Sequence, residues 1–424
     1  MRRYVIFVPL LLVAIATSAQ KDSVATRFAG MITPEELREH LEYLASDELA
    51  GRETATDGQR MAAAYIEEHF RQLGLSAYEG DKYQQAFDVI SKKPSGSVVF
   101  QDTRYNFMED LYFYESYGDT SITGELVFAG SGNRKALTNT DLAGKIALVF
   151  DDTVGSLKPD GTSSDWKYIR RYGTKNGVQA ILVVTPEFES KKQIVEYYLG
   201  FSQMILKEDA SEEEDPGIPF LFISRKMGEE LVSSSGIKLK KLHKADVGDE
   251  LDIEITMDFT SGKGDLSSTN VLGVLPGTTH PDDYLFITAH YDHLGTKGKL
   301  TFNGADDDGS GTSALLTMAS AFKKASDEGH GPARTIVFMA VSGEEKGLLG
   351  SDYYTRHPIF PLENTIADLN VDMIGRIDEE HTPDSNYVYL IGSDRLSTEL
   401  HEISEQVNDT YTQLDLDYTY NDPD

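Results

Sequence analysis

The sequence predicts an α/β protein: a mixed, mostly parallel sheet covered by helices on both faces, with a small β-rich domain inserted into it. First, nearly continuous apolar runs alternate with helical patterns late in the chain (283–290, 309–326, 334–342, 348–357 and 365–373). Second, from about Ser97 to Val247 short β-branched runs are separated by glycines and polar turns (124–130, 144–151, 179–185 and 218–224). Third, 424 residues exceed one typical domain.

Two amphipathic helices are expected near the start of the chain. Residues 33–46 begin with Thr-Pro-Glu-Glu, the order of a capping box, and continue with helical apolar spacing. Residues 57–75 repeat apolar positions every three to four residues and reach a stop signal at Gly74. A polar loop, 50–59, lies between them.

The first residues have the three parts of a secretory signal peptide. An arginine pair precedes an apolar stretch from Tyr4 to about Ala16, and small residues follow before Gln20. A membrane anchor is the alternative, but the stretch is shorter than the roughly 20 residues of a spanning helix. We therefore expect an exported protein, periplasmic or extracellular, with no stable membrane insertion after signal removal. The expected division is signal peptide 1–19, first part of the main domain 20–96, inserted domain 97–247 and main-domain core 248–424.

Composition excludes some classes of function. A net charge of −31 without a dense basic patch argues against nucleic-acid binding, since a polyanion would be repelled. The hydrophobic content of 40% is ordinary for a globular protein. With no cysteines, an exported chain cannot use disulfides, so its stability comes from the core, with bound metal as a second source.

Polar groups with metal-binding chemistry follow the predicted strands. In 288-TAHYDHLG-295, strand alternation places His290 and Asp292 on one side and His293 on the other. A metal-bound imidazole whose second nitrogen contacts a carboxylate has this spacing. At Asp306, Asp307 and Asp308 one carboxylate can cap the following helix, and the other two exceed what capping requires, which suggests a carboxylate that bridges two cations.

Asp372 and the pair Glu344 and Glu345 complete the candidate set. Asp372 ends an apolar strand, where a carboxylate would be strongly desolvated unless it met a positive charge. Neighbouring side chains on an extended chain point in opposite directions, so the glutamates are expected to do different jobs. Glu345 would ligate metal while Glu344 takes a proton from bound water and returns it to a leaving amine. Mixed nitrogen and oxygen ligands suit zinc, with manganese or cobalt as substitutes.

At these motifs the chain resembles the M28 family of zinc-dependent metallopeptidases. The resemblance covers 288–295, 304–311, 342–351 and 370–372 in order, and extends to 44–59. It implies a zinc-exopeptidase-like fold holding two Zn²⁺ ions, and a non-proline cis peptide at Asp307-Asp308. The roles that it implies are His290 and Asp372 on one zinc, Asp307 bridging with Asp306 in reserve, Glu345 on the other zinc, Glu344 as general base and acid, and Asp292 orienting His290.

The resemblance implies an aminopeptidase that hydrolyses N-terminal residues of peptides. A non-catalytic module of the same fold and a glutaminyl cyclase-like enzyme are the alternatives. The inserted segment resembles a protease-associated domain. The family also has a late histidine on the second zinc, whereas here only His381 and His401 follow Asp372, in unlike surroundings. We therefore expect the natural protein to extend beyond Asp424 and to supply that ligand there.

Overall fold

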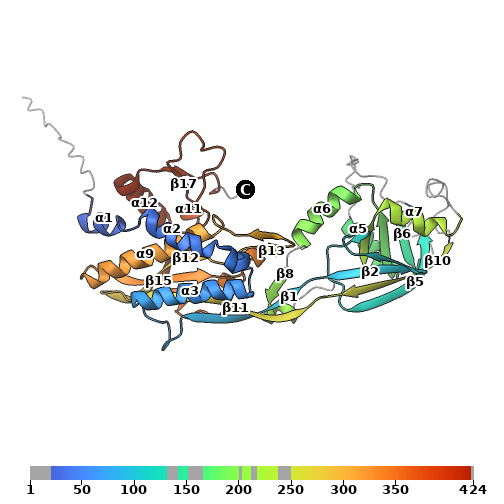
Figure 1. Ribbon diagram of the computed structural model, residues 1–424, viewed down its shortest axis with the longest axis horizontal. Coiled ribbons are helices and arrows are strands. Elements are labelled where there is room, and N and C mark those ends of the chain that lie inside the picture. The colour runs from blue at the N-terminus through green and yellow to red at the C-terminus, as the bar shows by residue number, and fades with distance from the viewer. Residues whose placement is uncertain are drawn as a thin grey trace, which may run out of the picture.

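The computed structural model describes residues 21–130, 142–150, 166–199, 203–211, 217–236 and 250–421. Two sheets form two lobes, joined by long strands that run between them (Figure 1). The predicted signal peptide, 1–19, lies outside the described residues. Within these ranges, no helix combines the length and the apolar character needed to cross a membrane.

The first lobe is built on a six-stranded sheet. From one edge to the other its strands are β16 (Thr365–Asn370), β12 (His280–His290), β15 (Arg334–Val341), β11 (Gly264–Leu275), β1 (Gln84–Lys92) and β8 (Gln203–Leu206). β12 pairs in parallel with both β15 and β16, and its register sets His290 opposite Val341. The carboxyl ends of these three strands therefore meet at one edge of the sheet, where ligands bind in open α/β sheets.

The predicted α/β class with a mixed sheet is confirmed. Parallel pairing is confined to β16, β12 and β15, and the other three pairs are antiparallel, so there are fewer parallel pairs than expected for a mostly parallel sheet. The chain path explains this. β1 leaves towards the second lobe, and β11 returns from it directly after β10 (Glu250–Thr260), so the two strands run in opposite directions.

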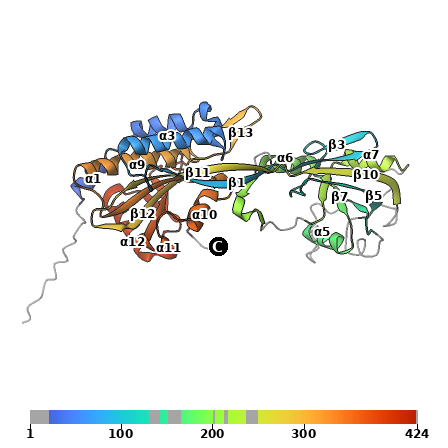
Figure 2. The ribbon, with the colours of Figure 1, turned by 90° about the horizontal axis from the view of Figure 1, so that it is seen from below.

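Helices cover both faces of the sheet (Figure 2). One face carries α2 (Pro34–Leu44), α3 (Asp57–Leu73) and α9 (Gly309–Asp327), and the other carries α10 (Leu349–Arg356). Successive residues of β15 alternate between the two cores, with Phe338 in the first and Val337 in the second. The predicted start of α2 and end of α3 are confirmed: the Thr33 side chain accepts a hydrogen bond from the Glu36 N–H, and Gly74 ends α3 in the left-handed conformation. α2 ends at Leu44, two residues before the predicted limit.

The second lobe contains an eight-stranded sheet. Its strands are, in spatial order, β3 (Thr103–Asn106), β2 (Ser95–Phe100), β10, β5 (Thr120–Phe128), β6 (Ile146–Phe150), β7 (Ala180–Val184), β9 (Phe220–Ile223) and β4 (Leu111–Tyr112). Its helices are α5 (Trp166–Lys175), α6 (Phe188–Leu199) and α7 (Arg225–Ser233). β5, β6, β7 and β9 are the four strands expected in this region. The boundary at 247 lies outside the described residues, so the domain limits stay a prediction.

Short elements complete the chain. They are α1 (Ser23–Ala29), η1 (Asp47–Arg52), η2 (Lys207–Ser211), β13 (Gly295–Lys297), β14 (Leu300–Phe302), η3 (Glu344–Lys346), η4 (Leu362–Asn364), β17 (Tyr387–Tyr389), α11 (Ser393–Leu396), α12 (Thr398–Val407), η5 (Asn408–Thr412) and β18 (Asp415–Asp417). Of these, η1 and η3 lie at the carboxyl edge of the first sheet and shape the site described next.

Candidate metal centre

A buried segment follows β12. His290 is 2% exposed, and the next residues Tyr291, Asp292 and His293 are buried as well. The Tyr291 N–H donates to the Val341 carbonyl at 3.0 Å, which ties the segment to the end of β15. The imidazoles of His290 and His293 therefore sit in fixed positions next to the loop that carries Glu344.

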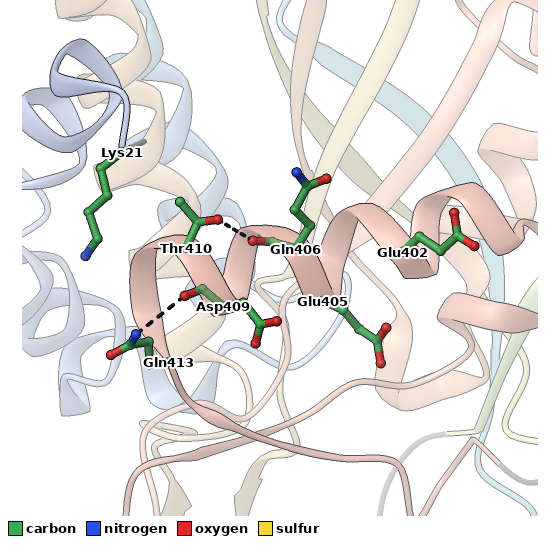
Figure 3. Close-up of a pocket in the computed structure, with 7 residues that line it drawn as sticks. All are labelled: Lys21, Glu402, Glu405, Gln406, Asp409, Thr410 and Gln413. Carbon is green, nitrogen blue, oxygen red and sulfur yellow. Dashed lines mark hydrogen bonds between the residues drawn. The ribbon is translucent and has the colours of Figure 1, made fainter. Parts of the chain in front are cut away.

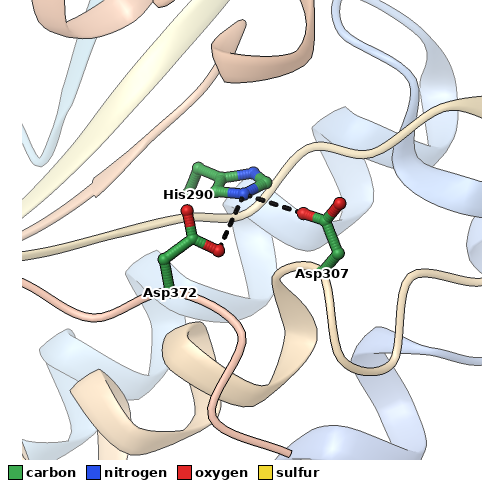
Figure 4. Close-up of side chains that lie close together, drawn as sticks. All are labelled: His290, Asp307 and Asp372. Atoms are coloured by element: carbon green, nitrogen blue, oxygen red, sulfur yellow. Dashed lines mark ion pairs between the residues drawn. The ribbon is translucent and has the colours of Figure 1, made fainter. Parts of the chain in front are cut away.

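His290 lies among three predicted carboxylates. Its Nε2 is 3.0 Å from Asp307 Oδ1, 3.7 Å from Asp372 Oδ1 and 3.9 Å from Glu344 Oε2. Figure 4 shows Asp307 and Asp372 approaching the same ring nitrogen of His290 from different directions. One atom each of His290, Asp307 and Asp372 lies within 4.8 Å of the others, close enough to hold one ion.

A second group lies on the other side of Asp307. His293 Nδ1 is 2.6 Å from Glu345 Oε1 and 3.9 Å from Asp307 Oδ2. These three atoms also lie within 4.8 Å of one another. The expectation that His293 faces away was wrong, because β12 ends at His290 and strand alternation no longer applies beyond it.

The three aspartates before α9 have different roles in the fold. Asp308 caps the helix, accepting from the Gly311 N–H at 2.8 Å. Asp306, the reserve candidate, accepts from the Gly375 N–H at 2.8 Å and belongs to neither group. Asp307 alone presents one oxygen to each group, and its peptide bond to Asp308 is cis, as expected.

The two neighbouring glutamates point into different groups. They form a 3-10 turn after Gly343, which has a positive φ of 77°, so they are not on an extended strand as predicted. Glu345 contacts His293, whereas Glu344 approaches His290. The two carboxylates point in different directions, as expected. The turn produces this separation, and strand alternation does not.

Asp292 contacts His290 through its backbone. The Nδ1 atom lies 3.1 Å from the Asp292 carbonyl oxygen and 3.8 Å from its carboxylate. The carboxylate instead accepts from the Thr54 hydroxyl at 2.6 Å and from the Glu344 N–H at 3.2 Å. Asp292 is thus placed to orient the imidazole and to hold the turn that carries Glu344.

Asp372 is less buried than predicted. Its side chain is 40% exposed. The expectation of strong desolvation was wrong because β16 is at the edge of the sheet formed by the described residues and ends at Asn370, before Asp372. Its contribution to the site is therefore its position beside His290, not the cost of burying it.

The electrostatics of the centre favour a cation. Burial on its own would lower the pKa of His290, but the carboxylates of Asp307 and Asp372 raise it to about 11. Burial raises the pKa of Glu344 and raises that of Asp308 to about 8. Carboxylates crowded around one imidazole favour added positive charge.

The donors also fit zinc. Imidazole nitrogen and carboxylate oxygen are its usual partners. In addition, His293 Nδ1 and Glu345 Oε1 are buried 2.6 Å from each other, and neither makes a hydrogen bond. A bound ion is one ordinary explanation of such buried polar atoms.

Sequence reasoning missed the residues that hold the loops of the candidate metal centre together. Arg52 is fully buried, and its guanidinium donates to the carbonyls of Tyr291, Leu44, Asn303 and Gly304. Lys346 Nζ is 2.9 Å from Glu53 Oε1, which ties η3 to the residue after η1. The only sequence signal was the resemblance of 44–59 to the family, which gave these residues no role.

The late histidines make other contacts. His381 stacks on Tyr387 with ring centroids 3.6 Å apart, and its ring nitrogens contact Asp378 and Asp417. His401 contacts Ser393 and Glu405. An open hollow of about 620 Å³ is lined by residues of α12 and η5, by Gln413 after η5 and by Lys21, without a histidine (Figure 3). None of these residues belongs to either metal-binding group in the described chain.

Comparison with known proteins matches one part of the chain to a family. The profile of peptidase family M28 matches residues 270–423, which include every candidate ligand. This segment is similar to peptidase family M28. Aminopeptidase YwaD of Bacillus subtilis (strain 168) is 26% identical over 78% of this chain and 60% of its own length. A glutamate carboxypeptidase 2 homolog of Caenorhabditis elegans is 28% identical over 68% and 42%.

A solved structure supports the fold. BSAP, a zinc aminopeptidase from Bacillus subtilis, superposes with a TM-score of 0.52 at 22% identity, over 90% of this chain and 78% of that one. The predicted zinc-exopeptidase-like fold is thereby confirmed. The chain spans less than two thirds of the length of the two sequence relatives.

Proposed function

We propose that the chain is an exported zinc exopeptidase of the aminopeptidase type, which removes N-terminal residues from peptides. The observation that carries this is Asp307, whose two carboxylate oxygens face separate histidine-containing groups, with Glu344 beside the first. Two metal ions sharing one carboxylate are a recurrent arrangement in aminopeptidases. The names of YwaD and BSAP support the same class of activity.

In this proposal each residue has a defined task. His290 and Asp372 would hold one ion, Glu345 would hold the other, and Asp307 would serve both. Bound zinc would polarise the scissile carbonyl and lower the pKa of a water to about 7. Glu344 accepts the proton from that water at its carboxylate and returns it to the leaving amine. Asp292 keeps His290 oriented through its carbonyl and keeps Glu344 in place by accepting from its N–H.

The environment of Glu344 suits this task. Its side chain is about one third exposed, so a substrate can reach it. Burial of the rest raises its pKa above the ordinary value, which makes the carboxylate a better base.

Two further parts of the proposal concern the rest of the chain. The second lobe is proposed to be a protease-associated domain, and residues 1–19 a signal peptide cleaved on export. Sequencing the N-terminus of the protein recovered from the periplasm or medium checks the latter. We expect it to begin at Gln20, and a start at Met1 would contradict export through this signal.

A substrate panel tests the activity. The zinc-loaded chain is assayed on amino-acid p-nitroanilides, on N-terminally blocked peptides and on N-terminal glutaminyl peptides, before and after chelation. We expect zinc-dependent release of p-nitroaniline and no cleavage of blocked peptides. Cyclisation of glutaminyl peptides alone would indicate the cyclase, and no turnover of any substrate would indicate a non-catalytic module.

A further inference from the structure

We propose that Glu53 and Lys346 form a positioning pair that fixes the turn carrying Glu344. This inference rests on the proposed function, because it concerns the placement of the general base. Lys346 Nζ lies 2.9 Å from Glu53 Oε1, and the two side chains are only 3% and 18% exposed. The partners are 293 residues apart along the chain. Neither belongs to a metal-binding group of the described chain, so the pair would act through Glu344.

The first argument is that the turn needs contacts from outside to hold it. η3 has three residues between two glycines in the left-handed region, with φ of 77° at Gly343 and 100° at Gly347. Glycine has no side chain to restrict its backbone, so such a turn has little rigidity of its own. A general base must lie within about 2.6–3.2 Å of the group whose proton it takes. Outside contacts therefore decide whether Glu344 stays at that distance.

The second argument is that both ends of the turn are tied to the same short segment. At the start, the Glu344 N–H donates to the Asp292 carboxylate at 3.2 Å, and this carboxylate accepts from the Thr54 hydroxyl at 2.6 Å. At the end, Lys346 contacts Glu53. The consecutive residues Glu53 and Thr54 thus hold the two ends of η3, and the ion pair is the direct one of the two connections.

The third argument is that Glu53 is itself held in place. A side chain at Gly295 would put its Cβ 2.6 Å from Glu53 Cβ and 2.9 Å from Glu53 Oε2, so only glycine lets this backbone pack against the glutamate. A β-bridge also joins Glu53 to His293, in the segment directly after β12. Because Glu53 is anchored in this way, it fixes the position of the ammonium group that it contacts.

The fourth argument is that a buried ion pair is a poor means of stabilising a fold. Taking both charges out of water costs free energy that their attraction only partly returns, and an apolar pair of similar volume is often as stable or more stable. Stability alone therefore does not account for a buried lysine and glutamate at this place. The geometry that the pair imposes on the turn of the general base does account for it.

Steady-state kinetics at matched zinc content test the proposal. The double variant Glu53→Met/Lys346→Met removes the pair without leaving an unpaired buried charge, and circular dichroism confirms that it folds. Glu79 and Lys82, 2.8 Å apart and exposed, give the control double variant Glu79→Met/Lys82→Met. On an amino-acid p-nitroanilide we expect kcat to fall about 10–100-fold in the first variant, because a misplacement of about 1 Å costs about 100-fold. KM should stay within about threefold, and the control should keep the wild-type kcat.

A second background shows whether the pair acts through Glu344. In Glu344→Gln the base is already removed, so adding Glu53→Met/Lys346→Met should lower the residual kcat by less than about threefold. A residue pair that supported the site in another way would lower kcat by the same factor in both backgrounds.

Three results would overturn the proposal. One is a wild-type kcat in the folded, zinc-loaded Glu53→Met/Lys346→Met variant, and another is an equal loss in the wild-type and Glu344→Gln backgrounds. In both cases the zinc peptidase stands and only the positioning role fails. If the wild-type chain has no zinc-dependent turnover, the proposed function fails and the positioning role fails with it.

Discussion

Replacing Arg52 by methionine should lower the free energy of unfolding of the first lobe, because Arg52 holds together the segments that carry the metal centre. The guanidinium is 0% exposed and makes four hydrogen bonds to backbone carbonyls of three separate segments. Two of those carbonyls, on Asn303 and Gly304, belong to the loop before Asp307, and a third, on Tyr291, lies between His290 and His293. Methionine keeps most of the apolar stem but donates no hydrogen bond.

The magnitude follows from two opposing contributions. Hydrogen bonds from a charged donor contribute about 1.5–3 kcal/mol each, so the four together contribute about 6–12 kcal/mol. Burial, opposed only in part by nearby carboxylates, lowers the pKa of Arg52 from 12.5 to about 10, so the charged guanidinium carries a net cost of about 3 kcal/mol that methionine avoids. The net loss expected for Arg52→Met is therefore about 3–9 kcal/mol, a large fraction of the stability of one lobe.

Urea unfolding of the metal-free protein measures this loss. The two lobes need not unfold together, so far-UV circular dichroism is compared with fluorescence of the single tryptophan, Trp166, which begins α5 in the second lobe. We expect the transition of the first lobe to move to lower urea while the Trp166 transition stays. Arg71→Met, an exposed arginine on α3, should cost no more than about 1 kcal/mol. If Arg52→Met costs as little as Arg71→Met, the structural role given to Arg52 is refuted.

Three further predictions concern the ions and pH. Glu345→Gln should lower zinc affinity at one of two sites by at least about tenfold in calorimetric titration, because a neutral amide is a weaker ligand than a carboxylate, and an unchanged affinity would remove Glu345 from the ligand set. Chelation should lower the melting temperature of the first lobe, since zinc at 100 times its Kd stabilises by about 2.7 kcal/mol, and identical melting curves would contradict zinc binding to the folded state. Burial and the nearby His69 lower the pKa of His40 to about 4, so the unfolded chain takes up a proton below pH 6.5 while the folded chain stays neutral until about pH 4. The contribution of His40 to the free energy of unfolding, taken as the difference between the wild type and His40→Gln, should fall by about 2 kcal/mol from pH 7 to pH 5, and a difference that stays constant with pH would refute the assignment.

The candidate site could be located from sequence because its residues sit at the ends of parallel strands. β12, β15 and β16 are apolar runs, and their carboxyl ends meet wherever the rest of the chain goes. That rule brought His290, Glu344 and Asp372 together without knowledge of a single contact. Asp307 was found in the same way, because its loop precedes a helix that packs on the same sheet.

The other features of the site depend on turns and tertiary contacts, which the alternation of side chains along a strand does not predict. His293 was misplaced because the extended strand was assumed to continue past His290, whereas the chain turns towards Gly295, whose φ is 81°. Asp372 was expected to be buried because the apolar run before it resembles a central strand, but its strand is at the edge of the described sheet. Arg52 was missed because its partners lie up to 252 residues away along the chain. Such contacts follow from tertiary packing and leave no local periodicity.

The central claim is that Glu344 moves the proton in a zinc-dependent hydrolysis while other residues hold the ions. Its most direct test is the turnover of an amino-acid p-nitroanilide by Glu344→Gln at a zinc content matched to that of the wild type. We expect full zinc loading and a kcat lowered by at least about 10³-fold, because the amide keeps the shape of the side chain and cannot accept the proton. A variant with wild-type zinc and a kcat within about tenfold of the wild type would contradict the claim.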